Sequence, residues 1–218
     1  MEIIIIGAGG HGSEVYSYVQ DLAALNPCLR VVGFVDENKP RGPWMGTEIL
    51  GNFEELRASL RLHDSSRYIT AVGNNQVRRA FVKKAESPGA LNLPAWSLIH
   101  HKAVIGRDVE IGVGACLAPG SIVTTRVRVG KHCIVNVNAS VSHDCVVGDF
   151  VNINPGVVIA GNARIGEGCF IGAGATILDN VTIGEWTVIG AGAVVVDDIP
   201  AHVTAVGVPA RVIKQHNA

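Results

Sequence analysis

The chain has 218 residues, of which 48% are hydrophobic and 17% are charged, and its formal net charge at pH 7 is −1. This length and apolar content are enough for a substantial core in two modest domains, and they exclude a disordered chain. Because Lys and Arg form no cluster, we expect no basic stripe of the kind that binds nucleic acid.

The first residues and the cysteines predict a cytoplasmic protein with reduced thiols. MEIIII has an acidic second residue, and its apolar run is too short for a signal peptide or for membrane insertion. The five cysteines include no CxxC pair, and Cys133, Cys145 and Cys169 recur at one position of a repeat described below. We interpret them as small core residues, not as a disulfide framework or a zinc site.

Residues 1–100 predict an α/β domain with a small, Rossmann-like parallel sheet. A buried strand over 2–6 is followed by GAGGHGSEV, which should turn into a helix through about Leu25. Gly7, Gly9 and Gly12 match GxGxxG, a pattern that places backbone N–H groups and a helix N-terminus around a phosphate. The next strand, LRVVGFVD, ends at Asp36, whose carboxylate could accept hydrogen bonds from a ribose or a base.

The glycine-rich turn has three interpretations. A full dinucleotide site needs two mononucleotide-binding halves, and about 100 residues precede the repeat. The pattern therefore favours a nucleotide-containing substrate over NAD. A tight turn with a purely structural role is the third reading.

The rest of this domain predicts one more sheet edge with polar residues. Residues 37–51 are rich in Pro and Gly and indicate a loop, and a helix should run from the Asn52 cap to Leu62. RYITAVGNNQVRRAFVKKAE gives strand, loop and helix, placing Gly73, Asn74 and Asn75 at the carboxyl end of a strand, where ligands of parallel sheets gather. Asn74 or Asn75 could instead only cap the helix. Residues 87–94 are predicted as a connector and 95–100 as a final strand.

Residues 103–198 consist of sixteen hexads with no residue inserted or lost, and the third position of each is aliphatic. Such a period predicts a parallel β-helix over 101–198, with three hexads per coil. Residues eighteen apart should then stack about 4.8 Å apart along the axis. Gly, Asn and Asp at positions four to six predict corners with positive φ. The hexads fail after Asp198, and 199–218 should cap the open strand edge.

One titratable pair lies at a corner of this repeat. His143 and Asp144 are the fifth and sixth residues of ASVSHD, and a carboxylate beside an imidazole is typical of a general base near neutral pH. A plain surface pair is the alternative. Gly161 lies eighteen residues further on, where its N–H could hold the oxyanion of an attacked carbonyl. Cys145 occupies a first position and is expected in the core.

A metal site within one chain is not expected. No two of His132, His143 and His202 are separated by a multiple of eighteen, so their side chains should not stack at one corner. Zinc ligands shared between subunits stay open as an alternative.

Several segments together resemble a known family. The GAGGHG opening, the strand ending at Asp36, VGNN from Val72, SHDCVVGDF, AGNARIGEGCFIGAGA and the closing VGVPAR cover nearly the whole chain. They resemble the bacterial sugar O-acyltransferases of the sialic acid O-acetyltransferase type. This hexapeptide-repeat family includes acetyl-CoA-dependent N-acetyltransferases of nucleotide-linked 4-amino sugars, and it implies a left-handed β-helix.

The resemblance also implies partners and site residues. It implies a homotrimer in polysaccharide biosynthesis, with active sites between adjacent β-helices. His143 would be the general base, and Asp144 would orient it. Where some members carry a second His that contacts the cofactor, this chain has Asn152, which can still donate a hydrogen bond. Acetyl-CoA would lie near Gly161, Ala173 and Ala191, with no metal, and the sugar nucleotide near Gly10, His11, Gly12, Asp36, Glu37, Gly73, Asn74 and Asn75.

The leading prediction is direct acetyl transfer from acetyl-CoA to the amino group of a nucleotide-linked sugar. In this scheme His143 removes the proton and the amide near Gly161 stabilises the oxyanion. The second hypothesis is O-acetylation of a sugar hydroxyl such as that of a sialic acid. The third is a trimer that binds nucleotide sugars without catalysis.

Overall fold

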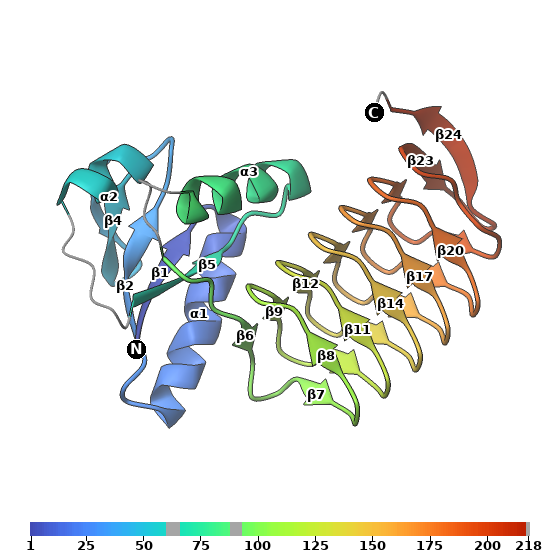
Figure 1. Ribbon diagram of the computed structural model, residues 1–218, viewed down its shortest axis with the longest axis horizontal. Helices are drawn as coiled ribbons and strands as arrows, with labels where there is room; N and C mark the ends of the chain where they lie inside the picture. The colour runs from blue at the N-terminus through green and yellow to red at the C-terminus, as the bar shows by residue number, and fades with distance from the viewer. Residues whose placement is uncertain (60–65, 88–92, 217–218) are drawn as a thin grey trace. The chain divides into compact units, whose positions relative to one another are not determined.

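The computed structural model of the protein describes residues 1–59, 66–87 and 93–216. The chain divides into two compact units, Met1–His100 and His101–Ala218, and each is described by itself (Figure 1). Among the described residues, no helix is long and apolar enough to cross a membrane.

The first unit is the predicted small α/β domain. Its sheet has the order β3-β4-β2-β1-β5, and β1 pairs in parallel with β2 and with β5. Ile3, Ile4, Ile5 and Ile6 of β1 are fully buried, as is typical of a central parallel strand whose side chains are covered on both faces of the sheet. The bounds are β1 (Glu2–Ile6), α1 (Gly10–Leu25), β2 (Arg30–Val35), β5 (Ser66–Thr70) and α3 (Asn75–Glu86).

The segment 37–51, predicted as a loop, contains two strands. β3 (Gly42–Trp44) and β4 (Thr47–Gly51) form an antiparallel hairpin, and β4 also pairs in parallel with β2. Met45 and Gly46 make the turn with φ of 48° and 77°. The loop prediction was wrong. It relied on the local Pro and Gly content, whereas β4 forms because its backbone pairs with β2, a strand outside the segment.

The helix after Asn52 and the strand over 95–100 were also predicted in this unit. The Asn52 cap is correct: Asn52 Oδ1 accepts from the Glu55 amide at 2.9 Å, and Glu55 Oε2 accepts from the Asn52 amide at 2.9 Å, before α2 (Phe53–Ser59). The predicted end of this helix, 60–62, lies outside the described residues, as does most of the connector. The predicted strand 95–100 is only a parallel bridge from Ala95 to Tyr68 and the short β6 (Leu98–Ile99).

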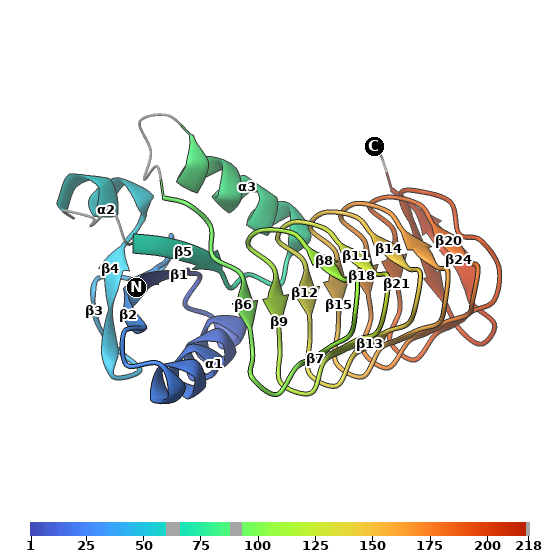
Figure 2. The ribbon, with the colours of Figure 1, turned by 60° about the horizontal axis from the view of Figure 1, so that its bottom comes forward.

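The second unit is a parallel β-helix, as predicted. Each hexad contributes one two-residue strand, and every strand pairs in parallel with the strand eighteen residues away (Figure 2). The sixteen strands form three sheets. Sheet one contains β7 (Val104–Ile105), β10 (Ile122–Val123), β13 (Ser140–Val141), β16 (Val158–Ile159), β19 (Thr176–Ile177) and β22 (Val194–Val195). Sheet two contains β8 (Glu110–Ile111), β11 (Arg128–Val129), β14 (Val146–Val147), β17 (Arg164–Ile165) and β20 (Thr182–Ile183). Sheet three contains β9 (Cys116–Leu117), β12 (Ile134–Val135), β15 (Asn152–Ile153), β18 (Phe170–Ile171) and β21 (Val188–Ile189).

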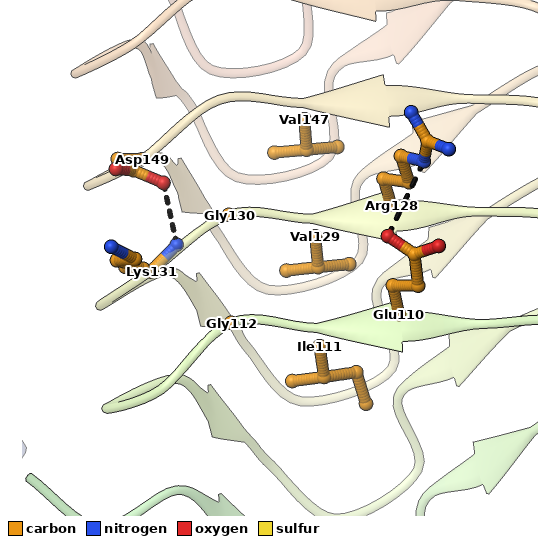
Figure 3. Close-up of a pocket in the computed structure, with 9 residues that line it drawn as sticks. All are labelled: Glu110, Ile111, Gly112, Arg128, Val129, Gly130, Lys131, Val147 and Asp149. Atoms are coloured by element: carbon orange, nitrogen blue, oxygen red, sulfur yellow. Dashed lines mark hydrogen bonds and ion pairs between the residues drawn. The ribbon is translucent and has the colours of Figure 1, made fainter.

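The interior of the column is filled by the first and third residues of the hexads. From Ala115 onwards all of these side chains are buried. Ile111, Val129 and Val147 stack one above another in Figure 3, which shows how third positions from successive coils meet. Such stacks from all three sheets together form the hydrophobic core of the unit, which also contains Cys133, Cys145 and Cys169.

Positive φ at the corners is confined to fewer positions of the hexad than predicted. In fifteen of the sixteen hexads the sixth residue has a positive φ, between 53° and 76°. The fourth-position glycines do not. A Cβ on Gly166 would lie 2.5 Å from the backbone N of Glu185, and one on Gly106 would lie 1.8 Å from Thr124 O. These glycines are required because the neighbouring coil approaches closely, not because the turn needs a left-handed residue.

The tail continues the stack with a shortened coil. Ile199 bridges to Ile183, and β23 (Val203–Val206) pairs in parallel with β21, so the spacing falls from eighteen residues to sixteen. β24 (Arg211–Gln215) then folds back antiparallel on β23. The open edge of β21 is thereby paired.

A pair of glycine substitutions should separate the two corner constraints. Gly166→Ala is expected to destabilise by about 3 kcal/mol, because the new Cβ meets backbone that cannot move. Gly156→Ala should cost only about 1 kcal/mol, because φ is 69° there but the space is open. Thermal unfolding followed by circular dichroism measures both, and equal losses of Tm would contradict this account.

Candidate active site

Three predicted loops of the first unit lie side by side at the carboxyl edge of its sheet. The Gly7 amide donates to Val35 O at 2.8 Å, and the Ala71 amide donates to Ile6 O at 2.7 Å. The carboxyl ends of β1, β2 and β5 therefore meet at one edge of the sheet, where ligands of parallel sheets gather.

Asp36 is engaged with the backbone at this edge. Its Oδ2 accepts from the Ala8 amide at 2.8 Å, and its Oδ1 accepts from the amides of Asn38 and Lys39 at 2.9 and 3.1 Å. Lys39 Nζ donates to Ala8 O at 2.6 Å and lies 3.4 Å from the centroid of the Trp44 ring. Asp36 thus stabilises the conformation of the glycine-rich turn. Lys39 was not identified from the sequence as part of this edge, because it lies in the segment that was predicted as a loop.

The glycines of the turn have two different roles. A Cβ on Gly12 would lie 2.2 Å from Gly7 O, so Gly12 is needed for packing of the turn on α1. Gly9, Gly10 and Gly73 face open space, so nothing in the described structure requires the absence of a side chain there. At Gly9 and Gly10, which are exposed, the lack of a side chain leaves backbone accessible to a ligand.

The polar residues predicted around this turn have protein partners. His11 Nδ1 lies 3.0 Å from Glu14 Oε2, and Glu37 Oε1 accepts from Lys84 Nζ at 2.8 Å. Asn74 caps α3, since its Oδ1 accepts from the Val77 amide at 3.0 Å. Asn75, the first residue of α3, is only 7% exposed.

The second group of predicted residues is at the corner between sheets one and two. His143 follows β13, and its side chain is 54% exposed. Its Nδ1 lies 2.8 Å from Asp144 Oδ2. Asp144 has a φ of 62°, so the left-handed corner directs the carboxylate back to the imidazole of the preceding residue. This contact favours the tautomer with the proton on Nδ1 and an open lone pair on Nε2.

Arg126 completes this cluster and was not predicted. Arg126 Nε donates to Asp144 Oδ1 at 2.7 Å, and its Nη2 donates to Oδ2 at 2.9 Å. Hydrogen bonds from Arg126 and then from His143 lower the pKa of Asp144 to about 2. The spacing of eighteen residues between Arg126 and Asp144 is the signal that could have revealed it.

Gly161 lies against the His143 ring, one coil along. A Cβ on Gly161 would lie 2.5 Å from Cε1 and 2.7 Å from Nε2 of His143, so only glycine leaves room for this position of the ring. The Gly161 amide donates no hydrogen bond to any residue that the structure describes. The predicted juxtaposition of the imidazole and Gly161 is present, but Gly161 itself is buried under the ring and not unshielded.

The remaining predicted residues are not at this corner. Ala173 and Ala191 are exposed, but they lie at the corner between sheets three and one, at the opposite edge of sheet one. Asn152 is on β15 of sheet three and is only 2% exposed, so in this conformation its side chain is not open to a ligand. One chain therefore does not gather the predicted acetyl-CoA residues.

The buried cysteines are inert, as expected. Cys145 Sγ donates to Ala160 O and Cys169 Sγ donates to Gly184 O, both at 3.0 Å. Burial raises the pKa of the Cys145 thiol and raises that of Cys169 to about 12. Cys145 is a core residue despite being next to Asp144.

A pocket on sheet two is lined by residues of β8, β11 and β14, where Arg128 and Glu110 pair at 3.3 Å between Nε and Oε2 (Figure 3).

Within the described ranges, no group of three or more His, Cys, Asp or Glu side chains is arranged to hold a metal ion.

Comparison with known proteins places the chain in a family. The PglD N-terminal domain model matches residues 2–85, and the bacterial transferase hexapeptide model matches residues 162–197. A crystal structure of a histidine-to-asparagine variant of perosamine N-acetyltransferase from Caulobacter crescentus, in complex with CoA and GDP-perosamine, is 32% identical, with a TM-score of 0.89. The match covers 99% of this chain and 98% of that one. The chain belongs to the hexapeptide-repeat sugar acetyltransferases that carry a PglD-type N-terminal domain.

Two other acetyltransferases are similar to the chain, one over almost its whole length and one over part of it. The acetyltransferase domain of PglB from Neisseria gonorrhoeae, solved with acetyl coenzyme A, is 33% identical, with a TM-score of 0.87, over 97% of this chain and 98% of that one. GDP-perosamine N-acetyltransferase from Escherichia coli O157:H7 is 29% identical over 148 residues. That alignment spans 67% of this chain and 64% of the curated relative, less than two thirds of its length.

The ionisation of Asp144 gives a direct test of the corner geometry. Its folded pKa of about 2 is below the unfolded value of about 3.9, so its contacts stabilise the fold above pH 4 and are lost as the pH falls towards 2. We expect its carboxyl carbon, followed by NMR of ¹³C-labelled protein and assigned with Asp144→Asn, to report an ionised group at pH 3. In Arg126→Met the midpoint should rise. A midpoint near 4 in the unmodified protein would contradict the paired geometry.

Proposed function

We propose that the protein transfers the acetyl group of acetyl-CoA to the amino group of a nucleotide-linked sugar. The observation that carries this proposal is the position of the His143 ring, which is fixed at Nδ1 by Asp144 and lies against Gly161. A base with an open Nε2 beside an amide donor matches what acyl transfer needs. The relatives named as N-acetyltransferases, one of them solved with CoA and GDP-perosamine, support an amine acceptor.

The transfer is proposed to be direct. The sugar nitrogen attacks the thioester carbonyl, the new C–N bond forms, and the carbonyl electrons move onto oxygen, where the Gly161 amide donates to the oxyanion. His143 Nε2 takes a proton from the attacking nitrogen. When the intermediate collapses, the C–S bond breaks and the imidazolium returns this proton to the CoA sulfur. Asp144 stays ionised throughout and stabilises the imidazolium.

The nucleotide part of the substrate is proposed to bind the first unit. The glycine-rich turn, where Gly9 and Gly10 face open space, would hold the nucleotide diphosphate. This assignment keeps the interpretation that the sequence favours, a nucleotide-containing substrate. Such an activity belongs with the assembly of polysaccharides from activated sugars.

The active site is proposed to need a second copy of the chain. The outer face of sheet one and the residues that directly follow its strands, called the apolar face here, expose aliphatic side chains between 38% and 58%: Val104, Ile122 and Val158 on the strands, and Leu178 and Val196 after β19 and β22. His143 and Gly161 border one edge of this face, whereas Ala173 and Ala191 border the other. Packing the apolar faces of three copies around an axis would bring the two edges of neighbouring chains together, giving the homotrimer expected for the family.

A CoA-release assay tests the reaction and the base. With acetyl-CoA and a nucleotide-linked 4-amino sugar we expect turnover, and with hydroxyl acceptors such as sialic acid we expect none. His143→Asn should lower kcat by at least 100-fold while acetyl-CoA still binds. His202→Asn is the matched control, because His202 is another histidine of the second unit beside a carboxylate, with its Nε2 3.5 Å from Glu185 Oε1.

Each other outcome of this assay points to another reading. If only hydroxyl acceptors were acetylated, the protein would be an O-acetyltransferase and not an N-acetyltransferase. Nucleotide-sugar binding in calorimetry without acetyl-CoA binding would indicate a non-catalytic trimer. Full turnover by His143→Asn would remove the base from the mechanism.

Charge on the apolar face should separate the subunits. Val158→Asp is expected to convert a trimer into chains of 22.9 kDa in multi-angle light scattering, with loss of turnover. Val113→Asp is the control, because Val113 is 45% exposed, similar to the 44% of Val158, but lies at the corner after β8, away from this face. A monomeric native protein, or an active monomeric variant, would contradict the shared site.

A further inference from the structure

We propose that Arg126 is a positioning residue for His143 and acts on it through Asp144. This proposal rests on the function proposed above, because it gives Arg126 a part in the same acetyl transfer. Arg126 and Asp144 are both sixth residues of their hexads and stand exactly one coil apart at the same corner. Nothing in the composition of either hexad alone points to this partnership.

The contact between Arg126 and Asp144 is a two-point fork. Nε donates to Oδ1 at 2.7 Å and Nη2 donates to Oδ2 at 2.9 Å, while Oδ2 also faces His143 Nδ1 at 2.8 Å. A carboxylate held at both oxygens cannot rotate freely, and the planar guanidinium fixes its plane. The direction from which Oδ2 meets the imidazole is therefore set by Arg126.

The corner offers no other described cation with this geometry. The column of sixth residues at this corner runs Asp108, Arg126, Asp144, Asn162, Asn180 and Asp198, and Asp108 attracts Arg126 from the other side. Arg126 adopts a φ of 53°, a left-handed conformation that is unfavourable for a long side chain. A positive charge is thus kept at a position where glycine or asparagine would fit the turn more easily.

Arg126 has two separable effects on His143. Its geometry orients the carboxylate, and its charge offsets the attraction of that carboxylate for an imidazolium, which favours the neutral ring that a general base needs. The other charged groups at this corner are Arg107 and Asp179, each two coils away in the column of His143, Asp197 three coils away in the same column, and Asp108 and Asp198 in the column of Asp144. Arg128 and Arg164 flank β14 on the adjacent sheet.

Two substitutions separate orientation from charge. Arg126→Lys keeps the charge but loses the fork, so we expect kcat to fall about 10-fold with the acid limb of the pH–kcat profile unmoved. Arg126→Met loses both, so kcat should fall and the acid limb should move up by about half a pH unit or more. The KM for acetyl-CoA should stay unchanged in both variants, because Arg126 is not proposed to touch the substrate.

Arg128→Met is the matched control. Arg128 is also an exposed arginine paired with a carboxylate one coil away, because its Nε lies 3.3 Å from Glu110 Oε2 (Figure 3). It is two residues from Arg126 but projects from β11 on sheet two. Its removal should leave kcat and the pH profile as in the native protein.

A measurement without substrate keeps the two proposals distinguishable. In ¹⁵N-histidine NMR of the unmodified protein above pH 7.5, His143, assigned with His143→Asn, should carry its proton on Nδ1, and Arg126→Met should show a mixture of tautomers. If Arg126→Met changes neither the tautomer nor the acid limb, the positioning role is overturned. A changed tautomer in a protein that acetylates no acceptor would support the positioning role and overturn the proposed function.

Discussion

Parallel pairing between residues eighteen apart is the interaction on which the second unit depends. It aligns every third hexad, buries one aliphatic side chain per strand, and brings the corners of successive coils into columns. The same alignment creates the candidate site. Arg126, Asp144, His143 and Gly161 belong to three successive coils and meet only because the hexads are uninterrupted between them.

The corner also explains why few residue types are free to vary there. At the fourth-position glycines a side chain would collide with the next coil. At the sixth positions the backbone adopts a left-handed conformation with positive φ. The fifth position has neither restriction, so functional side chains such as His143 can be placed there without weakening the column. Where a fifth residue is glycine, as at Gly161, its neighbour's side chain occupies the space.

The two units of the chain contribute different chemistry in the proposed reaction. The first supplies a turn held by Asp36 and Lys39 with open backbone, which suits a phosphate group. The second supplies a base and an amide donor but keeps its other predicted residues at the far edge of sheet one. An apolar outer face between those edges gives a physical reason for association with further copies.

The sequence by itself determined the β-helix, its core positions, the small parallel sheet and the His143–Asp144 pair, because a strict period and adjacent residues are local information. It left the hairpin over 42–51 unrecognised, because the hydrogen bonds that define β4 come from β2. It assigned positive φ to glycines whose real constraint is the neighbouring coil. Only the tertiary structure placed Arg126 on Asp144, buried Asn152, and separated Ala173 and Ala191 from His143, because these relations depend on which coil and which corner each residue occupies.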